Sequence, residues 1–335
     1  LLGARLRKGA TEWSDTFPMA DTPNLPDCNS TIFIDPRGTL WIFWVTIQDN
    51  EWHNSLLKYR TSTDYQGDGP PHWDWQDVIH TRPVKLDETY DKLLEGAEEK
   101  LKPLLVIEPK LAEGVASIRA ATHNKLEQRL GWMTRVKPIM VSDTRILLGL
   151  YSDLFNCSLA TFTDDWGKTW QCSEPIAPKE VNLLGNVQPA FAKRKNGDIV
   201  AYMRDNGIPK FVRTAVSHDG GVTWPDFTME KSIRDSGASV EVLVLQSGRW
   251  LLVNNDLTKG RHRLVAHVSE DEGATWKYTR DIETAEPEKG SFSYPGLIQA
   301  KDGTIHISYS YSREDVKGET IKHTAFNEEW LLEPK

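Results

Sequence analysis

The sequence is short of cysteine and of long apolar runs, and both shortages limit the kind of protein it can encode. Its three cysteines, Cys28, Cys157 and Cys172, lack the spacing of metal ligands, so we expect buried free thiols rather than a disulfide framework. No apolar run reaches the ~18 residues of a membrane-spanning helix, and the first residues lack a complete signal peptide. A Gly-rich phosphate loop is absent too, so the sequence implies no metal and no cofactor.

Positive charge is also scarce. The chain has 40 Lys and Arg against 48 Asp and Glu, which gives a net charge of −8 at pH 7 with the two signs interspersed. This pattern argues against nucleic acid and against an anionic membrane surface as partners. The 335 residues, 39% of them hydrophobic, are enough for a substantial soluble core. A small ligand or a glycan is therefore the partner class that remains.

An internal repeat is what the sequence does contain. Three segments of the form (S/T)-x-D-x-G-x-T-W begin at Thr163, Ser217 and Ser269, a little over 50 residues apart. In each segment the Asp and the Gly suit a tight turn, because the carboxylate accepts backbone N–H groups and glycine adopts positive φ. The Trp of each segment accounts for part of the 13 tryptophans. We call these segments the Asp turns.

Strand–turn–strand patterns repeat with the same period. Their turns fall near Gly38, Thr144, Gly197, Gly248 and Gly303. Successive turns are 106, 53, 51 and 55 residues apart, and the first interval is about two repeat lengths. We therefore count six units of four short antiparallel strands. The sequence predicts an all-β fold, a six-bladed β-propeller that forms one domain over residues 1–335.

Residues 86–130 interrupt the strand patterns. They contain helix-period runs rich in Glu, Lys, Leu and Ala. We expect a helical insertion in the second blade, serving as packing support, a lid or a dimer contact.

The two ends of the predicted blades differ in chemistry. The first strand of a blade begins, and the second ends, on the face opposite the turn. Nine residues before the five turns stand Asn29, Arg135, Gln188, Ser239 and Tyr294. These residues should ring the central channel, and further polar residues follow the second strands. We expect ligands to bind on this face, and we expect the Asp turns on the opposite face to be structural.

The repeated Asp turn resembles the Asp-box, or BNR repeat, of the sialidase (neuraminidase) superfamily, from about Pro23 to His323. The resemblance implies a glycoside hydrolase with a Tyr nucleophile and arginines that hold the substrate carboxylate. The family's Tyr matches Tyr294 in FSYPGLIQAKDG, its second arginine matches Arg204 in AYMRDNG, and its third matches Arg261 in GRHRLVAHVS. Guanidinium groups bind carboxylates bidentately. A phenol suits an acidic sugar because the sugar's own carboxylate would repel an anionic nucleophile.

Three family positions carry other residues here. Cys28 or Asn29 stands where the family has its first arginine, and Gln188 stands where it has the Glu that activates the Tyr. An amide cannot accept the phenol proton. The region of the family's acid/base Asp contains Asp49 and Glu51 in QDNEWHNS.

Other residues of the predicted channel could replace the missing groups. Arg135, with Lys137 nearby in GWMTRVKP, is the candidate for the missing arginine, and Glu241 is the candidate base for Tyr294. Gln188 and Asn29 then become substrate-binding candidates.

Three functions are compatible with these residues. The first is a retaining exo-glycoside hydrolase that removes a terminal acidic sugar, sialic-acid-like or uronic, from a glycan. The second is a uronate-specific polysaccharide lyase, which needs positive charge to neutralise a carboxylate and a Tyr or His to move a proton. The third is a non-catalytic glycan-binding propeller. We take the hydrolase as the working hypothesis.

Overall fold

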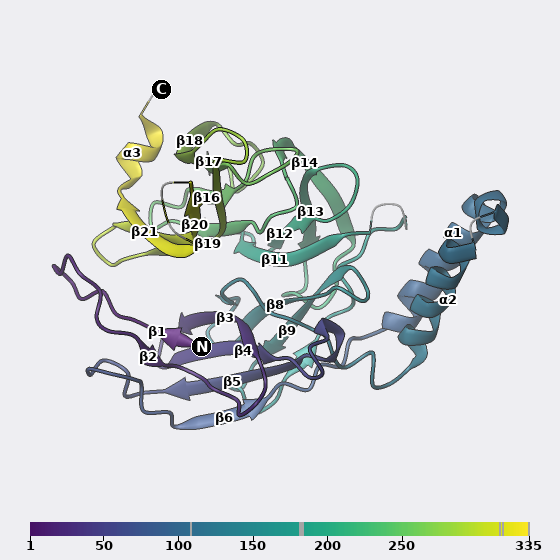
Figure 1. The fold of residues 1–335 in the computed structure, drawn as a ribbon, viewed down its shortest axis with the longest axis horizontal. Helices are drawn as coiled ribbons and strands as arrows, with labels where there is room; N and C mark the ends of the chain where they lie inside the picture. Colours follow the sequence, from purple (N-terminus) through teal and green to yellow (C-terminus); the bar gives the residue numbers. More distant parts are fainter. Residues whose placement is uncertain (108, 181–183, 315, 317, 334–335) are drawn as a thin grey trace.

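Five antiparallel sheets stand around a common centre in the manner of propeller blades (Figure 1). The computed structural model describes residues 1–107, 109–180, 184–314, 316 and 318–333. The predicted all-β propeller is confirmed, but the predicted number of six blades is wrong.

The first three blades have four strands each, hydrogen-bonded to their sequence neighbours. Blade 1 consists of β3 (Asp27–Ile34), β4 (Leu40–Thr46), β5 (Leu56–Ser62) and β6 (Trp75–Val78). Blade 2 consists of β7 (Ile139–Met140), β8 (Ile146–Ser152), β9 (Cys157–Thr163) and β10 (Gln171–Cys172). Blade 3 consists of β11 (Asn186–Lys193), β12 (Ile199–Asp205), β13 (Phe211–Ser217) and β14 (Asp226–Arg234).

The last two blades and the remaining elements complete the fold. Blade 4 consists of β15 (Glu241–Val244), β16 (Trp250–Asn254), β17 (Arg263–Ser269) and β18 (Tyr278–Thr284). Blade 5, in the part of the chain that is described, consists of β19 (Gly290–Gln299), β20 (Ile305–Arg313) and β21 (Thr320–Phe326). Outside the blades lie β1 (Leu2–Gly3), β2 (Phe17–Pro18), the short helix η1 (Trp52–Asn54), α1 (Leu86–Ile107), α2 (Pro109–His123) and α3 (Glu328–Leu332).

The second strands of blades 1 and 2 are buried on both faces, because other parts of the chain cover each side. Every residue of β4 and of β8 is buried, which explains why LWIFWVT and ILLGLYS are nearly continuous apolar runs. At the junction of blades 1 and 2, Trp41 stacks on Tyr59 with ring centroids 5.7 Å apart. Trp170 of the first Asp turn meets Trp41 edge-on at 6.5 Å. A tryptophan of the repeat thus packs between two blades.

Each Asp turn joins the third strand of a blade to its fourth. In the second Asp turn, Asp219 accepts hydrogen bonds from the Ser217 hydroxyl and from the backbone and hydroxyl of Thr223, at 2.6–2.9 Å. Asp165 and Asp271 make the equivalent bonds in blades 2 and 4. The side-chain bonds tie the end of one strand to the start of the next.

The interval between Gly38 and Thr144, which is long enough for two repeats, contains two helices where the spacing predicts an additional blade. Helices α1 and α2 pack against each other, lie between blade 1 and blade 2 in the chain, and project from the sheets (Figure 1). Tyr90 of α1 is buried against Phe155, whose carbonyl accepts a hydrogen bond from the Tyr90 hydroxyl. The helices therefore follow blade 1 and are not an insertion within a further blade. No helix in the described part of the chain is long and apolar enough to cross a membrane.

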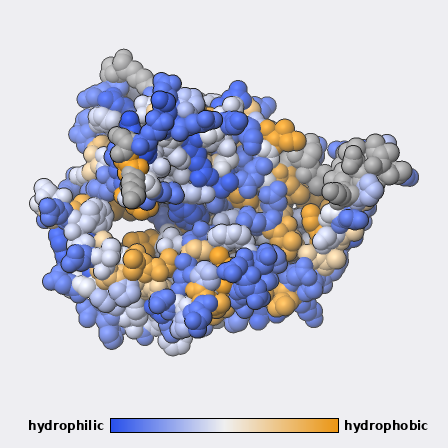
Figure 2. All heavy atoms as spheres, viewed as in Figure 1, coloured by the Kyte–Doolittle hydropathy of each residue, from blue (hydrophilic) through white to orange (hydrophobic). Residues whose placement is uncertain are grey.

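The ring of blades is open between blade 5 and blade 1. Ser308 is exposed at the centre of β20, and so are Ile298 on β19 and Ile32 on β3. Those positions would be covered if the two blades packed face to face. Among the described residues, the N-terminal segment contacts blade 5 at this junction, with Trp13 edge-on to His323 of β21 at 5.5 Å and Lys8 Nζ 3.8 Å from Asp302 Oδ2. Figure 2 shows a gap on this side of the molecule.

Candidate functional site

The first strands of blades 1, 3 and 5 have an unusual backbone conformation at one residue each. That residue lies nine positions before the turn that joins the first strand to the second. Asn29, Gln188 and Tyr294 have φ of 50°, 57° and 58°, and each lies at a shift of register between the first and second strands. A non-glycine residue in this region costs about 1–3 kcal/mol and is characteristic of functional sites. A bulge re-aims the side chain that it carries. The backbone of blades 1, 3 and 5 is thus specialised at the predicted channel positions.

Tyr294 lies between two arginines. Arg261 donates from Nη2 to the Tyr294 hydroxyl at 3.3 Å and from Nη1 to the Ser293 hydroxyl at 3.3 Å. Arg135 donates from Nη2 to the Tyr294 carbonyl at 3.0 Å. Both guanidinium carbons are 4.8 Å from the centroid of the Tyr294 ring. These contacts bring together residues that the sequence separates by 33 and 159 positions.

The positive charges change the acidity of the phenol. Burial by itself raises the pKa of Tyr294, but the charges of Arg261, Arg204 and Arg135 outweigh burial, so that its pKa lies below the usual value. Arg135 is partly buried, and desolvation lowers the pKa of its guanidinium despite the nearby Glu241 carboxylate. Tyr294 therefore loses its phenol proton at a lower pH than an ordinary exposed tyrosine does.

A second group of polar side chains links blades 1, 2 and 3. Gln188, only 4% exposed, accepts a long hydrogen bond of 3.5 Å from Nη1 of Arg204. Tyr151 on β8 accepts a hydrogen bond from Nδ2 of Asn29 at 3.0 Å and also interacts with Gln188. Burial raises the pKa of Tyr151 to about 12, so this phenol stays neutral at physiological pH. Nε of Arg204 is buried and has no partner among the described residues.

Glu241 is paired with lysine. Its Oε1 accepts a hydrogen bond from Nζ of Lys137 at 2.6 Å. Burial raises the pKa of Glu241, and the charges of Lys137 and Arg135 oppose that rise. Within the described residues, Glu241 has no hydrogen bond to Tyr294. Its position is that of a counter-ion for two cations, and this differs from the base position expected from the sequence.

Asp49 and Glu51 stay apart from these groups. Both are exposed in the loop between β4 and β5. Glu51 faces His53, with 3.8 Å between Oε2 and Nδ1. In the part of the chain that is described, no hydrogen bond or ion pair joins either carboxylate to Tyr294 or the arginines.

Asp153 and Ser293 belong to the site but were not among the predicted site residues. Asp153 directly follows β8 and is exposed, but partial desolvation of its carboxyl raises its pKa and outweighs the opposing charge of Arg204. Ser293 is buried beside Tyr294 and accepts the bond from Arg261. The sequence signal for Asp153 is the group of polar residues at the end of β8, the second strand of blade 2. For the bulges, the signal was the proline that follows Gln188 and Tyr294, since proline inside a sheet is confined to edges and bulges.

Sequence comparison identifies a family for more than half of the chain. The family model for a BNR repeat-like domain matches residues 119–307. A sialidase of Micromonospora viridifaciens is 23% identical over 183 residues, which is 52% of this chain and 26% of that protein. The match therefore spans about a quarter of the curated relative.

Solved structures share the fold over nearly the whole chain. A protein of unknown function from Dyadobacter fermentans has a TM-score of 0.67 at 15% identity, over 97% of this chain and 82% of that one. A Hadza microbial sialidase has a TM-score of 0.66 at 16% identity, over 98% of this chain and 59% of that one. At these identities the likeness concerns the fold alone.

Proposed function

Because this chain belongs to the sialidase-like BNR-repeat superfamily, we propose that it is a retaining exo-glycoside hydrolase that removes a terminal acidic sugar, sialic-acid-like or uronic, from a glycan. One observation carries the proposal: the Tyr294 phenol lies against Arg261 and Arg135 and within the field of Arg204. In this proposal the nucleophile and the guanidinium groups that bind the sugar carboxylate thus lie together.

In this proposal the arginines hold the sugar carboxylate. Guanidinium groups stay charged at all relevant pH values and can bind a carboxylate with two parallel hydrogen bonds. The unpartnered Nε of Arg204 is a donor that a bound carboxylate would satisfy. Gln188 and Asn29 contribute amide groups for the sugar, and Lys137 adds positive charge behind Arg135.

Tyr294 is the proposed nucleophile, and the arginines take over part of the activating role that a Glu has in the family. Gln188 cannot accept the phenol proton, but a phenol with a lowered pKa loses that proton more readily. Glu241 is assigned to hold Lys137 and Arg135 in place.

Asp153 is the proposed proton donor to the leaving group. Its raised pKa keeps it protonated to higher pH than an ordinary aspartate, as a general acid requires. Asp49 and Glu51 are the weaker candidates for this role because, among the described residues, neither has a hydrogen bond or ion pair with the arginines or Tyr294, whereas the carboxyl of Asp153 lies within the field of Arg204.

The substitution Tyr294→Phe tests the proposal. We expect hydrolysis of methylumbelliferyl sialosides or glucuronides to fall by about 100-fold or more. Binding of the free acidic sugar, measured by calorimetry, should change by less than about threefold. Full activity of the variant would refute the assigned nucleophile. An unsaturated uronate among the products would indicate a lyase, and binding without turnover across acidic glycans would indicate a binding propeller.

A further inference from the structure

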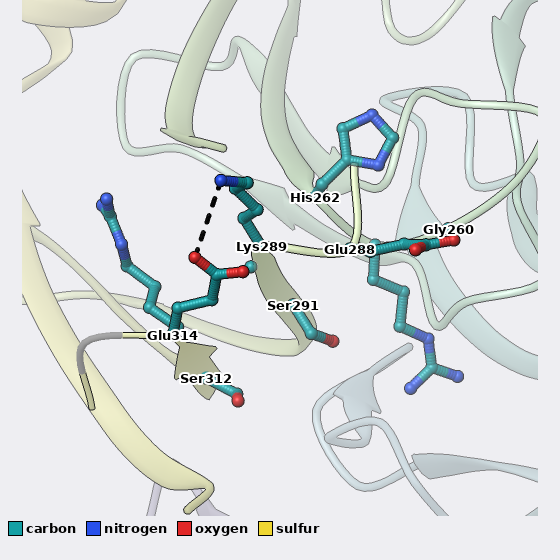
Figure 3. Close-up of a pocket in the computed structure, with 10 residues that line it drawn as sticks. Gly260, His262, Glu288, Lys289, Ser291, Ser312 and Glu314 are labelled. Carbon is teal, nitrogen blue, oxygen red and sulfur yellow. Dashed lines mark ion pairs between the residues drawn. The ribbon is translucent and has the colours of Figure 1, made fainter. Parts of the chain in front are cut away.

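The guanidinium of Arg204 is held more loosely than those of the other two site arginines. Arg261 lines a cavity of about 550 Å³ at the end of blades 4 and 5, which Figure 3 shows in close-up. Its guanidinium donates two hydrogen bonds of 3.3 Å, and that of Arg135 donates one of 3.0 Å to a backbone carbonyl. Among the described residues, Arg204 makes one long bond of 3.5 Å to Gln188, and its buried Nε has no partner. The position of Arg204 therefore depends on the backbone that carries it.

Backbone pairing ends just before Arg204 on one side of its strand. Strand β12 pairs with β13 as far as Met203, which lies opposite Arg213. Beyond that residue a side chain takes over. The Asp205 carboxylate accepts two hydrogen bonds from backbone N–H groups of the β12–β13 loop, at 2.6 Å and 2.7 Å. Asp205, the residue after Arg204, thus ties the end of β12 to the start of β13.

Asp205 is also one partner of an ion pair that is completely buried. Nη2 of Arg213 lies 3.1 Å from its Oδ1, and both side chains have an exposed fraction of 0%. Nε and Nη1 of Arg213 are buried without a hydrogen-bond partner among the described residues. Desolvation of the two charges offsets much of their attraction, and an apolar pair of similar volume is often as stable. We therefore expect the pair to act through the geometry of its neighbours more than through stability.

A second carboxyl group connects this pair to the start of blade 4. Asp235, which is 1% exposed, accepts hydrogen bonds from the N–H of Gly237 at 2.6 Å and from that of Asp205 at 3.4 Å. Its own N–H donates to the Lys210 carbonyl at 3.0 Å. Burial raises the pKa of Asp235 to about 7, and the Asp205 carboxylate adds to the rise. Near neutral pH Asp235 is therefore partly protonated, which brings the charge of the two carboxyl groups closer to that of the single guanidinium. We call Asp205, Arg213 and Asp235 the buried cluster.

The β12–β13 loop packs directly onto the buried cluster. A Cβ on Gly207 would lie 2.9 Å from Oδ1 of Asp205 and 3.1 Å from Nη2 of Arg213, so a larger residue there would displace the ion pair. The Asn206 N–H donates to the Gly185 carbonyl at 2.6 Å, which joins the loop to the segment before β11. The loop and the buried cluster thus hold each other in one arrangement.

We propose that Asp205, Arg213 and Asp235 are positioning residues that set the place of the Arg204 guanidinium for binding the carboxylate of an acidic sugar. The inference rests on the proposed function, since that function supplies the carboxylate. Among the described residues, no hydrogen bond or ion pair joins the buried cluster to Tyr294 or to the side chain of Arg204. The buried cluster therefore acts through the backbone at the end of β12.

Asp205→Asn tests this role, because it removes the charge and keeps the shape of the side chain. Displacement of Arg204 withdraws one of the positive charges that lower the pKa of Tyr294. We therefore expect that pKa to rise by about 0.5, measured by ultraviolet titration against the double variant that also carries Tyr294→Phe. Removal of a carboxylate charge alone would shift it the other way, because an anion raises the pKa of a nearby phenol.

KM is the kinetic parameter that the position of Arg204 should control. A carboxylate contact that is made equally in the ground state and in the transition state contributes to KM and not to kcat. In Asp205→Asn, KM for an acidic-sugar glycoside should rise about 10-fold, with kcat within about threefold of the unsubstituted protein. A loss of stability alone lowers the folded fraction, and therefore the apparent kcat, without moving KM or the Tyr294 titration.

Asp235→Asn is the second variant, which keeps the test open if Asp205→Asn does not fold. The amide places a donor against one of the backbone N–H groups that Asp235 accepts from, and it leaves the pair of Asp205 and Arg213 intact. We expect KM to rise about threefold, and the pKa of Tyr294 to move in the same direction as in Asp205→Asn.

Asp35→Asn is the matched control. Asp35 is 3% exposed, pairs with Arg37 at 2.7 Å and accepts a hydrogen bond from the Thr39 N–H at 3.0 Å. It lies in the turn between β3 and β4, at the end of blade 1 opposite the candidate site. Its substitution should lower stability and leave both KM and the Tyr294 titration unchanged.

An unchanged KM together with an unchanged or lowered pKa of Tyr294, in the folded variants of Asp205 and Asp235, would overturn the positioning role. Failure of the proposed function looks different. The unsubstituted protein would then neither bind nor hydrolyse acidic sugars, while the titration of Tyr294, which needs no ligand, would still report the displacement of Arg204.

Discussion

Lys137 and Glu241 form a buried ion pair between blade 2 and blade 4, with 2.6 Å between Nζ and Oε1. Glu241 is 3% exposed, and the charge of Arg135 also acts on it. The Glu241 carboxylate of this pair therefore also stabilises the charge of Arg135, the arginine that donates a hydrogen bond to the Tyr294 carbonyl.

Substitution of Glu241 by Gln should destabilise the protein. The change leaves Lys137 without its counter-ion in a largely buried position, and breaking one side of such a pair costs about 3 kcal/mol. Urea unfolding measures the loss. Glu270→Gln, which breaks an exposed pair with Lys277 and Arg249, should cost no more than about 1 kcal/mol. Normal stability with abolished turnover would instead favour Glu241 as the base for Tyr294.

Removal of Arg261 should make Tyr294 a weaker acid. Arg261 contributes the largest of the effects that lower the pKa of Tyr294. In Arg261→Ala the pKa therefore rises, and the rising limb of the activity–pH profile should move to higher pH, because the phenol loses its proton less readily. Ultraviolet titration of tyrosinate, as a difference from Tyr294→Phe, measures the pKa directly. Arg7→Ala, at an exposed position, should leave it unchanged, and an unmoved titration in Arg261→Ala would contradict the electrostatic explanation.

Asp153→Asn should separate good leaving groups from poor ones. A general acid contributes about 100-fold or more when the leaving group must be protonated, so kcat/KM for a natural glycan linkage should fall by that amount. An aryl glycoside needs little protonation and should be affected by less than about 10-fold. Asp49→Asn serves as the comparison: if that variant shows the selective loss and Asp153→Asn does not, the proton donor is Asp49.

The Asp turns should affect stability and not catalysis. Asp219→Ala removes the bonds to Ser217 and Thr223 and should cost about 1–2 kcal/mol of unfolding free energy, with kcat and KM unchanged. Burial raises the pKa of Asp219, but the hydrogen bonds lower it by more than burial raises it. The pKa of Asp219 therefore lies below the 3.8 of an ordinary Asp. The stabilisation is therefore complete at neutral pH and is lost as the pH falls through the acid range. A changed KM in Asp219→Ala would contradict a purely structural role.

The blade count shows where prediction from spacing failed. The 106 residues between Gly38 and Thr144 have the length of two repeats, and length alone cannot distinguish a blade from a helical pair. Residues 86–130 have the periodicity of a helix, but the repeat count predicts a blade around them. Helices α1 and α2 occupy that length without contributing a sheet.

The sequence by itself determined the propeller class and the Asp turns, and it marked Asn29, Gln188 and Tyr294 as equivalent positions of the first strands, because turn chemistry and strand patterns are local. Only the tertiary structure decided the number of blades, the open junction, and the partners of Glu241 and Tyr294. Those partners lie 104 and 159 residues away in the chain. Contacts at such separations depend on how blades close around a centre, and no local pattern encodes that geometry.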